Sequence, residues 1–110
     1  MSIFITQGRY THQSMTGLVG KPEDREAEVK ALVERSGGKF LSYYVTFGEY
    51  DWMLIYENSD ELSALAGTII GAASGTATGM KTTMAFTGAQ AKVAFERAQA
   101  AVSQFRAAGA

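Results

Sequence analysis

The sequence lacks several residue types that carry common chemistry. It has no cysteine, which excludes disulfides, thiolate metal sites and a cysteine nucleophile. His12 is its only histidine, so one chain cannot build a multi-histidine metal site, and we expect neither a metal nor another cofactor. Glycine is frequent, but its spacing matches neither of the glycine-rich motifs that cradle phosphates in nucleotide-binding proteins.

Charge and hydropathy limit the possible partners further. Lys and Arg number 10 and Asp and Glu 11, which gives a formal net charge of -1, and the basic residues are scattered singly. A nucleic-acid-binding surface needs clustered basic residues, so we expect no nucleic-acid partner. The N-terminal segment lacks the features of a secretory signal, and no uncharged apolar run has membrane-spanning length. We therefore expect a cytoplasmic protein with no membrane partner.

What the sequence does contain is a clear alternation of strand-like and helix-like segments. At 110 residues we expect one domain, 1–110, with a core over 3–86 and a C-terminal helix over about 88–107. The segments are expected in the order β-α-β-β-α-β before that last helix, which is the order of the ferredoxin-like α+β fold. The expected elements are a strand over 3–10, a helix after Pro22 that ends at Gly37-Gly38, an aromatic hairpin over 39–57, a helix after Ser59 or Asp60, a strand over 80–86, and a helix opened by a Thr87–Gln90 capping box.

Both faces of the hairpin carry large apolar side chains. In a ferredoxin-like fold the long helices cover one face of the sheet, so the other face needs a different cover. We expect two sheets to pack back to back in a homodimer. The residues assigned to this second face are Phe4, Tyr10, Tyr44, Trp52, Leu54 and Tyr56.

Three segments resemble a known family. They are the turn Gly48-Glu49-Tyr50-Asp51, the segment Tyr10-Thr11-His12-Gln13-Ser14 and the strand that follows Gly37-Gly38-Lys39. Over roughly 3–86 the chain looks like the GYD domain family of small bacterial proteins, which is similar to the dimeric α/β-barrel superfamily. The resemblance implies a fold and self-association, and it transfers no catalytic residue.

The turn Gly48–Asp51 has a structural and a catalytic interpretation. Glu49 or Asp51 could act as a base with Tyr50 as a proton donor. The structural interpretation is favoured: Gly48 would supply a positive φ, and Asp51 would accept hydrogen bonds from backbone amides.

Aromatic residues and the single histidine form a second candidate site. A cavity lined by rings and a few hydroxyl groups suits a small, flat ligand, although a subunit interface is also rich in Tyr and Trp. The candidate ligand-binding residues are Tyr10, His12, Tyr44, Trp52 and Tyr56.

The helix after Asp60 has two uncharged faces. Its expected core stripe is Leu62, Leu65, Ala66, Ile69 and Ala73. Gly67, Gly71 and Gly75 lie on the opposite side and are expected to pack against a neighbouring subunit, because glycine lowers helix stability unless a close approach compensates.

The sequence is compatible with three functions. The first is a non-catalytic homo-oligomeric module that binds a small apolar or aromatic molecule in a sheet-face or interface pocket. The second is a cofactor-independent monooxygenase or isomerase of the dimeric α/β-barrel kind, in which tyrosines and His12 would hold a substrate anion. The third is a purely structural assembly protein. The scarcity of ionisable residues near the expected pocket favours the first and the third.

Overall fold

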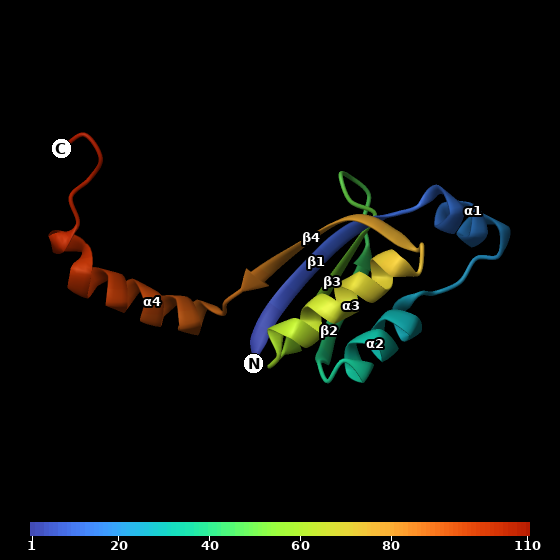
Figure 1. Ribbon diagram of the computed structural model, residues 1–110, viewed down its shortest axis with the longest axis horizontal. Coiled ribbons are helices and arrows are strands. Elements are labelled where there is room, and N and C mark those ends of the chain that lie inside the picture. Colours follow the sequence, from blue (N-terminus) through green and yellow to red (C-terminus); the bar gives the residue numbers. More distant parts are fainter.

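The computed structural model describes residues 1–110 and contains one four-stranded antiparallel sheet (Figure 1). The strands lie in the order β2-β3-β1-β4, with helices on one face, so the arrangement is ferredoxin-like as predicted. The strands are β1 (Ser2–Tyr10), β2 (Lys39–Val45), β3 (Trp52–Asn58) and β4 (Ala77–Ala85). The helices are α1 (His12–Gly20), α2 (Glu26–Arg35), α3 (Glu61–Ala73), α4 (Gly88–Ala101) and the short 3-10 helix η1 (Val102–Gln104).

Local signals set the helix boundaries. Thr87 accepts a hydrogen bond from the Gln90 backbone amide, and the Gln90 side chain accepts one from the Thr87 amide, so the predicted capping box opens α4. Asp60 caps α3 by accepting from the Leu62 amide at 3.0 Å. Gly37 has φ 81°, so the predicted left-handed end of α2 is also confirmed.

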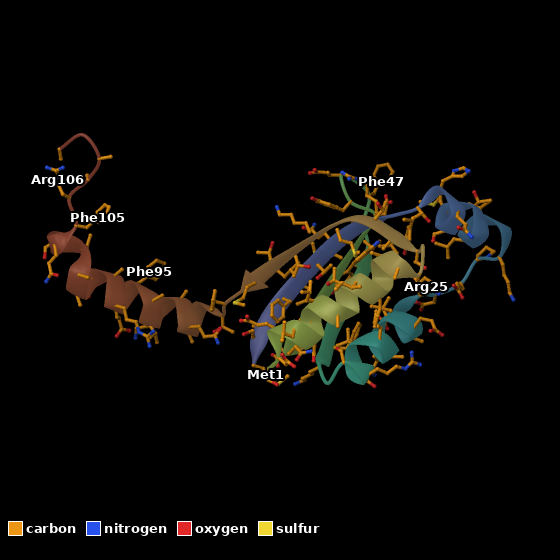
Figure 2. The ribbon with its side chains drawn as sticks, in the orientation of Figure 1. Met1, Arg25, Phe47, Phe95, Phe105 and Arg106 are labelled. Carbon is orange, nitrogen blue, oxygen red and sulfur yellow. The ribbon has the colours of Figure 1, made fainter.

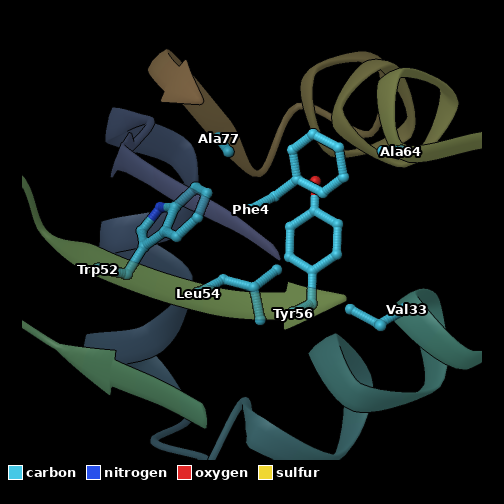
Figure 3. Packing of buried hydrophobic residues seen from close by; sticks show 7 residues of the cluster. All are labelled: Phe4, Val33, Trp52, Leu54, Tyr56, Ala64 and Ala77. Carbon is cyan, nitrogen blue, oxygen red and sulfur yellow. The ribbon is translucent and has the colours of Figure 1, made fainter. Parts of the chain in front are cut away.

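The core lies between the sheet and the helices α2 and α3 (Figure 3). The rings of Phe4 and Tyr56 stack with their centroids 5.5 Å apart. Trp52 and Leu54 extend this layer along β3, and Val33 of α2 packs against it. Sheet residues on this face are therefore covered by the chain's own helices.

The strand register shows that the face of the sheet without helices carries other residues than those predicted. Opposed residues of neighbouring strands share a face, and Phe4 pairs with Tyr56 within the buried layer. Phe4, Trp52 and Leu54 are all buried on the helix side, so the prediction that they form an outer dimer face was wrong. The opposite face holds Ile3, Ile5, Met53, Ile55 and Tyr44, which alternate with the buried residues.

The orientation expected for α3 was also wrong. Leu62 is 75% exposed and Leu65 is 55% exposed, whereas Ala64 is buried. The small residues of α3 face the sheet because the strands beneath already supply large rings, and a large side chain packs best opposite a small one. Gly67 and Gly71 thus lie on the sheet side, and Gly75 ends the helix region with φ 77°.

None of the helices combines the length and the apolar character needed to cross a bilayer.

Candidate functional site

A cavity of about 260 Å³ lies between the sheet and the helices α2 and α3. Its floor is formed by side chains of the sheet, among them Tyr10, Tyr43 and Trp52. The helix α3 forms its roof through Gly67 and Gly71. The cavity therefore exists where the aromatic face of the sheet meets the small-residue face of α3.

The two glycines leave this space open. A Cβ atom at Gly67 would have no other heavy atom within 4 Å, and one at Gly71 would lie 3.8 Å from Met80 Sδ, an ordinary contact. Neither glycine has a positive φ, so both positions accept a side chain without backbone strain. What their lack of a side chain provides is volume inside the fold.

Two phenol groups supply the central polar feature of the cavity. The hydroxyl oxygens of Tyr10 and Tyr43 lie 2.7 Å apart, and either hydroxyl can be the donor. One hydrogen occupies that bond, so the second hydroxyl hydrogen is available to another acceptor. Burial, reinforced by this hydrogen bond, raises the pKa of the Tyr43 phenol far above its usual range. Tyr43 therefore keeps its proton at neutral pH and remains a donor.

Other polar residues also line the cavity, among them Thr6, Ser36, Thr68 and Thr76. Thr6 and Thr82 share a 2.9 Å hydrogen bond across β1 and β4. Arg25 and Glu28 line the cavity from the N-terminal end of α2, where Arg25 forms a 2.9 Å ion pair with Glu23. No buried side-chain nitrogen or oxygen lacks a partner. The cavity is thus lined mostly by apolar surface and aromatic rings, with polar side chains among its lining.

The structure brings together three of the five residues expected to bind a ligand. Tyr10, Trp52 and Tyr56 all line the cavity. Tyr44 lies on the other face of the sheet and is 59% exposed. His12 is the first residue of α1, is exposed, and does not line the cavity.

A β-bulge explains why Tyr43 was missed and Tyr44 was chosen. The pairing of β2 with β3 shifts between Phe40 and Ser42, so Leu41 is an extra residue. Strict alternation would place Phe40 and Tyr44 on one face, but the bulge moves Tyr43 to the side of Phe40 and of the cavity. Two adjacent tyrosines give no sequence signal that distinguishes the two registers.

The turn Gly48–Asp51 is held to the end of β1 by several hydrogen bonds. Asp51 Oδ2 accepts from the Tyr10 amide at 2.9 Å, and the Asp51 amide donates to the Gly8 carbonyl at 2.8 Å. Arg9 Nε donates to the Glu49 carbonyl at 2.9 Å, and its guanidinium lies 5.2 Å from the centre of the Tyr50 ring. These contacts are those of a structural clamp on the strand that carries Tyr10. Gly48 does not have the positive φ that was expected of it.

We expect Asp51→Ala to lower the free energy of unfolding by about 1–2 kcal/mol, because it removes a charge-assisted hydrogen bond to a partly buried amide. Asp51→Asn keeps an acceptor oxygen and should lose less. Urea unfolding of the two variants measures the difference. Equal stability of Asp51→Ala and the parent would argue against the clamp.

No group of three His, Cys, Asp or Glu side chains is placed to hold a metal ion.

Comparison with known proteins agrees with the resemblance seen in the sequence. Residues 4–95 match the model of the GYD domain. No curated protein matches the chain. TTHA0845 from Thermus thermophilus is 19% identical over 80% of this chain and 96% of its own, with a TM-score of 0.49. PHS023 from Pyrococcus horikoshii is 18% identical over 79% of this chain and 92% of its own, with a TM-score of 0.46. FFRP-DM1 is 17% identical over 78% of this chain and 100% of its own, with a TM-score of 0.43.

Proposed function

We propose that this chain, which belongs to the GYD domain family, is a non-catalytic homo-oligomeric module that binds a small aromatic molecule. The observation that carries the proposal is the ring-lined cavity between the sheet and α3. Cavities that are mostly apolar and contain a few well-placed polar groups are the usual form of small-molecule sites. A helix that only covered a sheet would normally fill this space with its own side chains.

Volume and chemistry define the class of ligand. An apolar cavity of roughly 150 Å³ holds benzene, so about 260 Å³ suits one substituted ring or a small bicyclic molecule. The unused hydroxyl hydrogen of the Tyr10–Tyr43 pair favours a ligand with one acceptor oxygen, such as a phenol or an aryl ketone. Phenols, nitrophenols and naphthols are therefore the first compounds to test.

Trp52 provides a direct signal for binding. It is the only tryptophan of the chain, and it is buried at the wall of the cavity. A nitrophenol bound beside it should quench its fluorescence in a saturable way and raise the melting temperature. Absence of both effects across the whole panel would contradict the proposal.

We expect the double substitution Tyr10→Phe/Tyr43→Phe, which removes both hydroxyls that could donate, to weaken binding of an acceptor-bearing ligand by about fivefold, since a neutral hydrogen bond contributes about 1 kcal/mol. Binding of a ligand that has the same ring but no acceptor should change little. Titration of Trp52 fluorescence with a matched pair, such as naphthol and naphthalene, measures the two effects separately. Equal losses for both ligands would indicate a packing defect and not a lost hydrogen bond.

The acid–base character of the cavity favours binding over catalysis. Efficient proton transfer needs a positioned group whose pKa lies near the working pH. Tyr43 has its pKa shifted away from that range and His12 lies outside the cavity, which leaves Glu28 as the one carboxylate that lines it. Turnover of a phenolic compound that is lost in Tyr43→Phe would instead support the alternative of a cofactor-independent oxygenase or isomerase.

The self-association in this proposal uses the face of the sheet that the helices leave uncovered. On that face Ile5 of β1 pairs with Ile55 of β3, Tyr44 of β2 pairs with Met53 of β3, and Ile3 pairs with Glu57. An apolar surface spread over three neighbouring strands is typical of a protein–protein contact. Two copies packed through this face would remove it from water.

We expect Ile55→Asp to convert the oligomer into smaller species, because an unpaired charge in a desolvated interface costs about 3 kcal/mol or more, or more than about a hundredfold in affinity. The monomer should stay folded, since Ile55 points away from the core. Ser59→Asp, in the exposed segment after β3, is the matched control. Light scattering that gives the same mass for Ile55→Asp and the parent would show that this face is not the contact.

A further inference from the structure

The helix α4 lies apart from the rest of the fold. It extends from the end of β4 and continues directly into η1, away from the sheet and its helices (Figure 1). The radius of gyration is 17.9 Å, against about 13 Å for a compact chain of this length. A helix of this length has marginal stability in water when nothing packs against it.

Apolar residues line one side of α4 and continue into η1. Phe95 is 74% exposed and Phe105, just beyond η1, is 80% exposed (Figure 2). Charged residues of α4, such as Lys92 and Glu96, fall on other sides of the helix. The spacing alternates between four and three residues, the period with which one helix packs along another. The seam consists of Ala91, Phe95 and Ala98 of α4, followed by Val102 of η1 and Phe105 beyond it.

The outward face of α3 has the same character. Leu62, Leu65 and Ile69 are each more than half exposed, and no charged residue occurs between Glu61 and Lys81. Leu62, Ala66, Ile69 and Ala73 repeat the same alternation of four and three residues. α3 has 13 residues and α4 has 14, so the two helices are of similar length.

The chain does not join these two seams within one molecule. Only Phe86 and Thr87 separate β4 from α4. Thr87 is fixed by both hydrogen bonds of the capping box, at 3.1 Å and 2.8 Å, which sets the direction in which the helix starts. That direction leads away from the chain's own α3 (Figure 1).

We infer that α4 of one copy packs along the outer face of α3 of a second copy, and that the exchange is reciprocal. A two-fold dimer pairs each surface with its complement on the other subunit, so both exposed seams are covered at once. The alanines that separate the large residues of α4 leave room for Leu62, Leu65 and Ile69. Pairing of α4 with α4 would cover one seam and leave α3 exposed.

The absence of cysteine permits a direct cross-linking test. Ala66→Cys marks the outer face of α3, and Ala98→Cys marks the seam of α4. The two single variants are co-expressed with different affinity tags and treated with a short bis-maleimide. A cross-link between differently tagged chains, formed by the Ala66→Cys and Ala98→Cys pair, is the expected result. Ala100→Cys, on the opposite side of α4, should give no cross-link with Ala66→Cys.

Three other outcomes of the cross-linking experiment would overturn the inference. A cross-link in Ala98→Cys alone would indicate pairing of α4 with α4. An intramolecular cross-link in the Ala66→Cys/Ala98→Cys double variant at high dilution would show that α4 folds back on its own chain. No cross-link in any combination would show that the two seams do not meet.

A charged substitution tests whether the cross-link depends on contact through the seam of α4. Phe95→Glu places a charge on the seam and should abolish the cross-link between Ala66→Cys and Ala98→Cys chains. Ala100→Glu adds the same charge on the opposite side and should leave it unchanged. An equal loss with both substitutions would contradict packing through this face of α4.

Discussion

Gly67→Leu is expected to abolish ligand binding while the protein stays folded. The new side chain would extend from the roof of the cavity into space where a Cβ atom meets no neighbour within 4 Å. A leucine occupies a large part of about 260 Å³, so an aromatic ring would no longer fit. We expect the affinity for phenols to fall by more than about a hundredfold, or by about 3 kcal/mol.

We expect Gly67→Leu to raise the free energy of unfolding, although it abolishes binding. Replacing a helical glycine by a better helix former stabilises by up to about 1 kcal/mol, and the cavity accepts the added volume. The matched control is Ala66→Leu, one residue earlier and on the exposed outer face. Isothermal titration should show normal binding for the control. Normal binding in Gly67→Leu would mean that the ligand does not occupy this cavity.

Gly8→Ala is expected to lower the free energy of unfolding by about 2–3 kcal/mol, the upper part of the range for overpacked cores. A Cβ atom at Gly8 would lie 2.4 Å from Trp52 Cζ2 and 2.9 Å from Met80 Cγ. Both neighbours are themselves packed, so the strand or the indole ring must move. Guanidinium unfolding measures the change, and the emission of Trp52 reports whether its surroundings are altered.

The control for this prediction is a glycine with free space around it. Gly17 lies in α1, where an added Cβ atom meets nothing within 4 Å. Gly17→Ala should therefore stabilise the protein by up to about 1 kcal/mol through helix propensity alone. If Gly8→Ala were as stable as the parent, the close packing of Trp52 over β1 would be incorrect.

The local parts of the fold could be predicted because nearby residues determine them. The Thr87–Gln90 capping box joins residues three apart, and the left-handed end of α2 depends on Gly37 alone. The order of strands and helices followed from such local signals, and it is the order of a ferredoxin-like sheet.

Local signals could not predict on which side of a strand or helix each side chain lies. The bulge at Leu41 reverses the alternation along β2, so Tyr43 and not the predicted Tyr44 lines the cavity. The helix α3 is uncharged on both sides, so hydrophobicity alone favoured burying Leu62 and Leu65. The rings of the sheet decide otherwise, because they occupy the space beneath the helix. The same misjudged orientation concealed the cavity and its glycine roof.

Binding of an aromatic ligand in the cavity can be tested with a crystal structure of the protein grown with the tightest-binding phenol or naphthol of the panel. We expect electron density for one ring inside the cavity, beneath Gly67 and beside Trp52, with the ligand oxygen within hydrogen-bonding distance of Tyr10 or Tyr43. An empty cavity in a crystal that carries the ligand elsewhere, for example against Tyr44 on the opposite face of the sheet, would contradict this expectation.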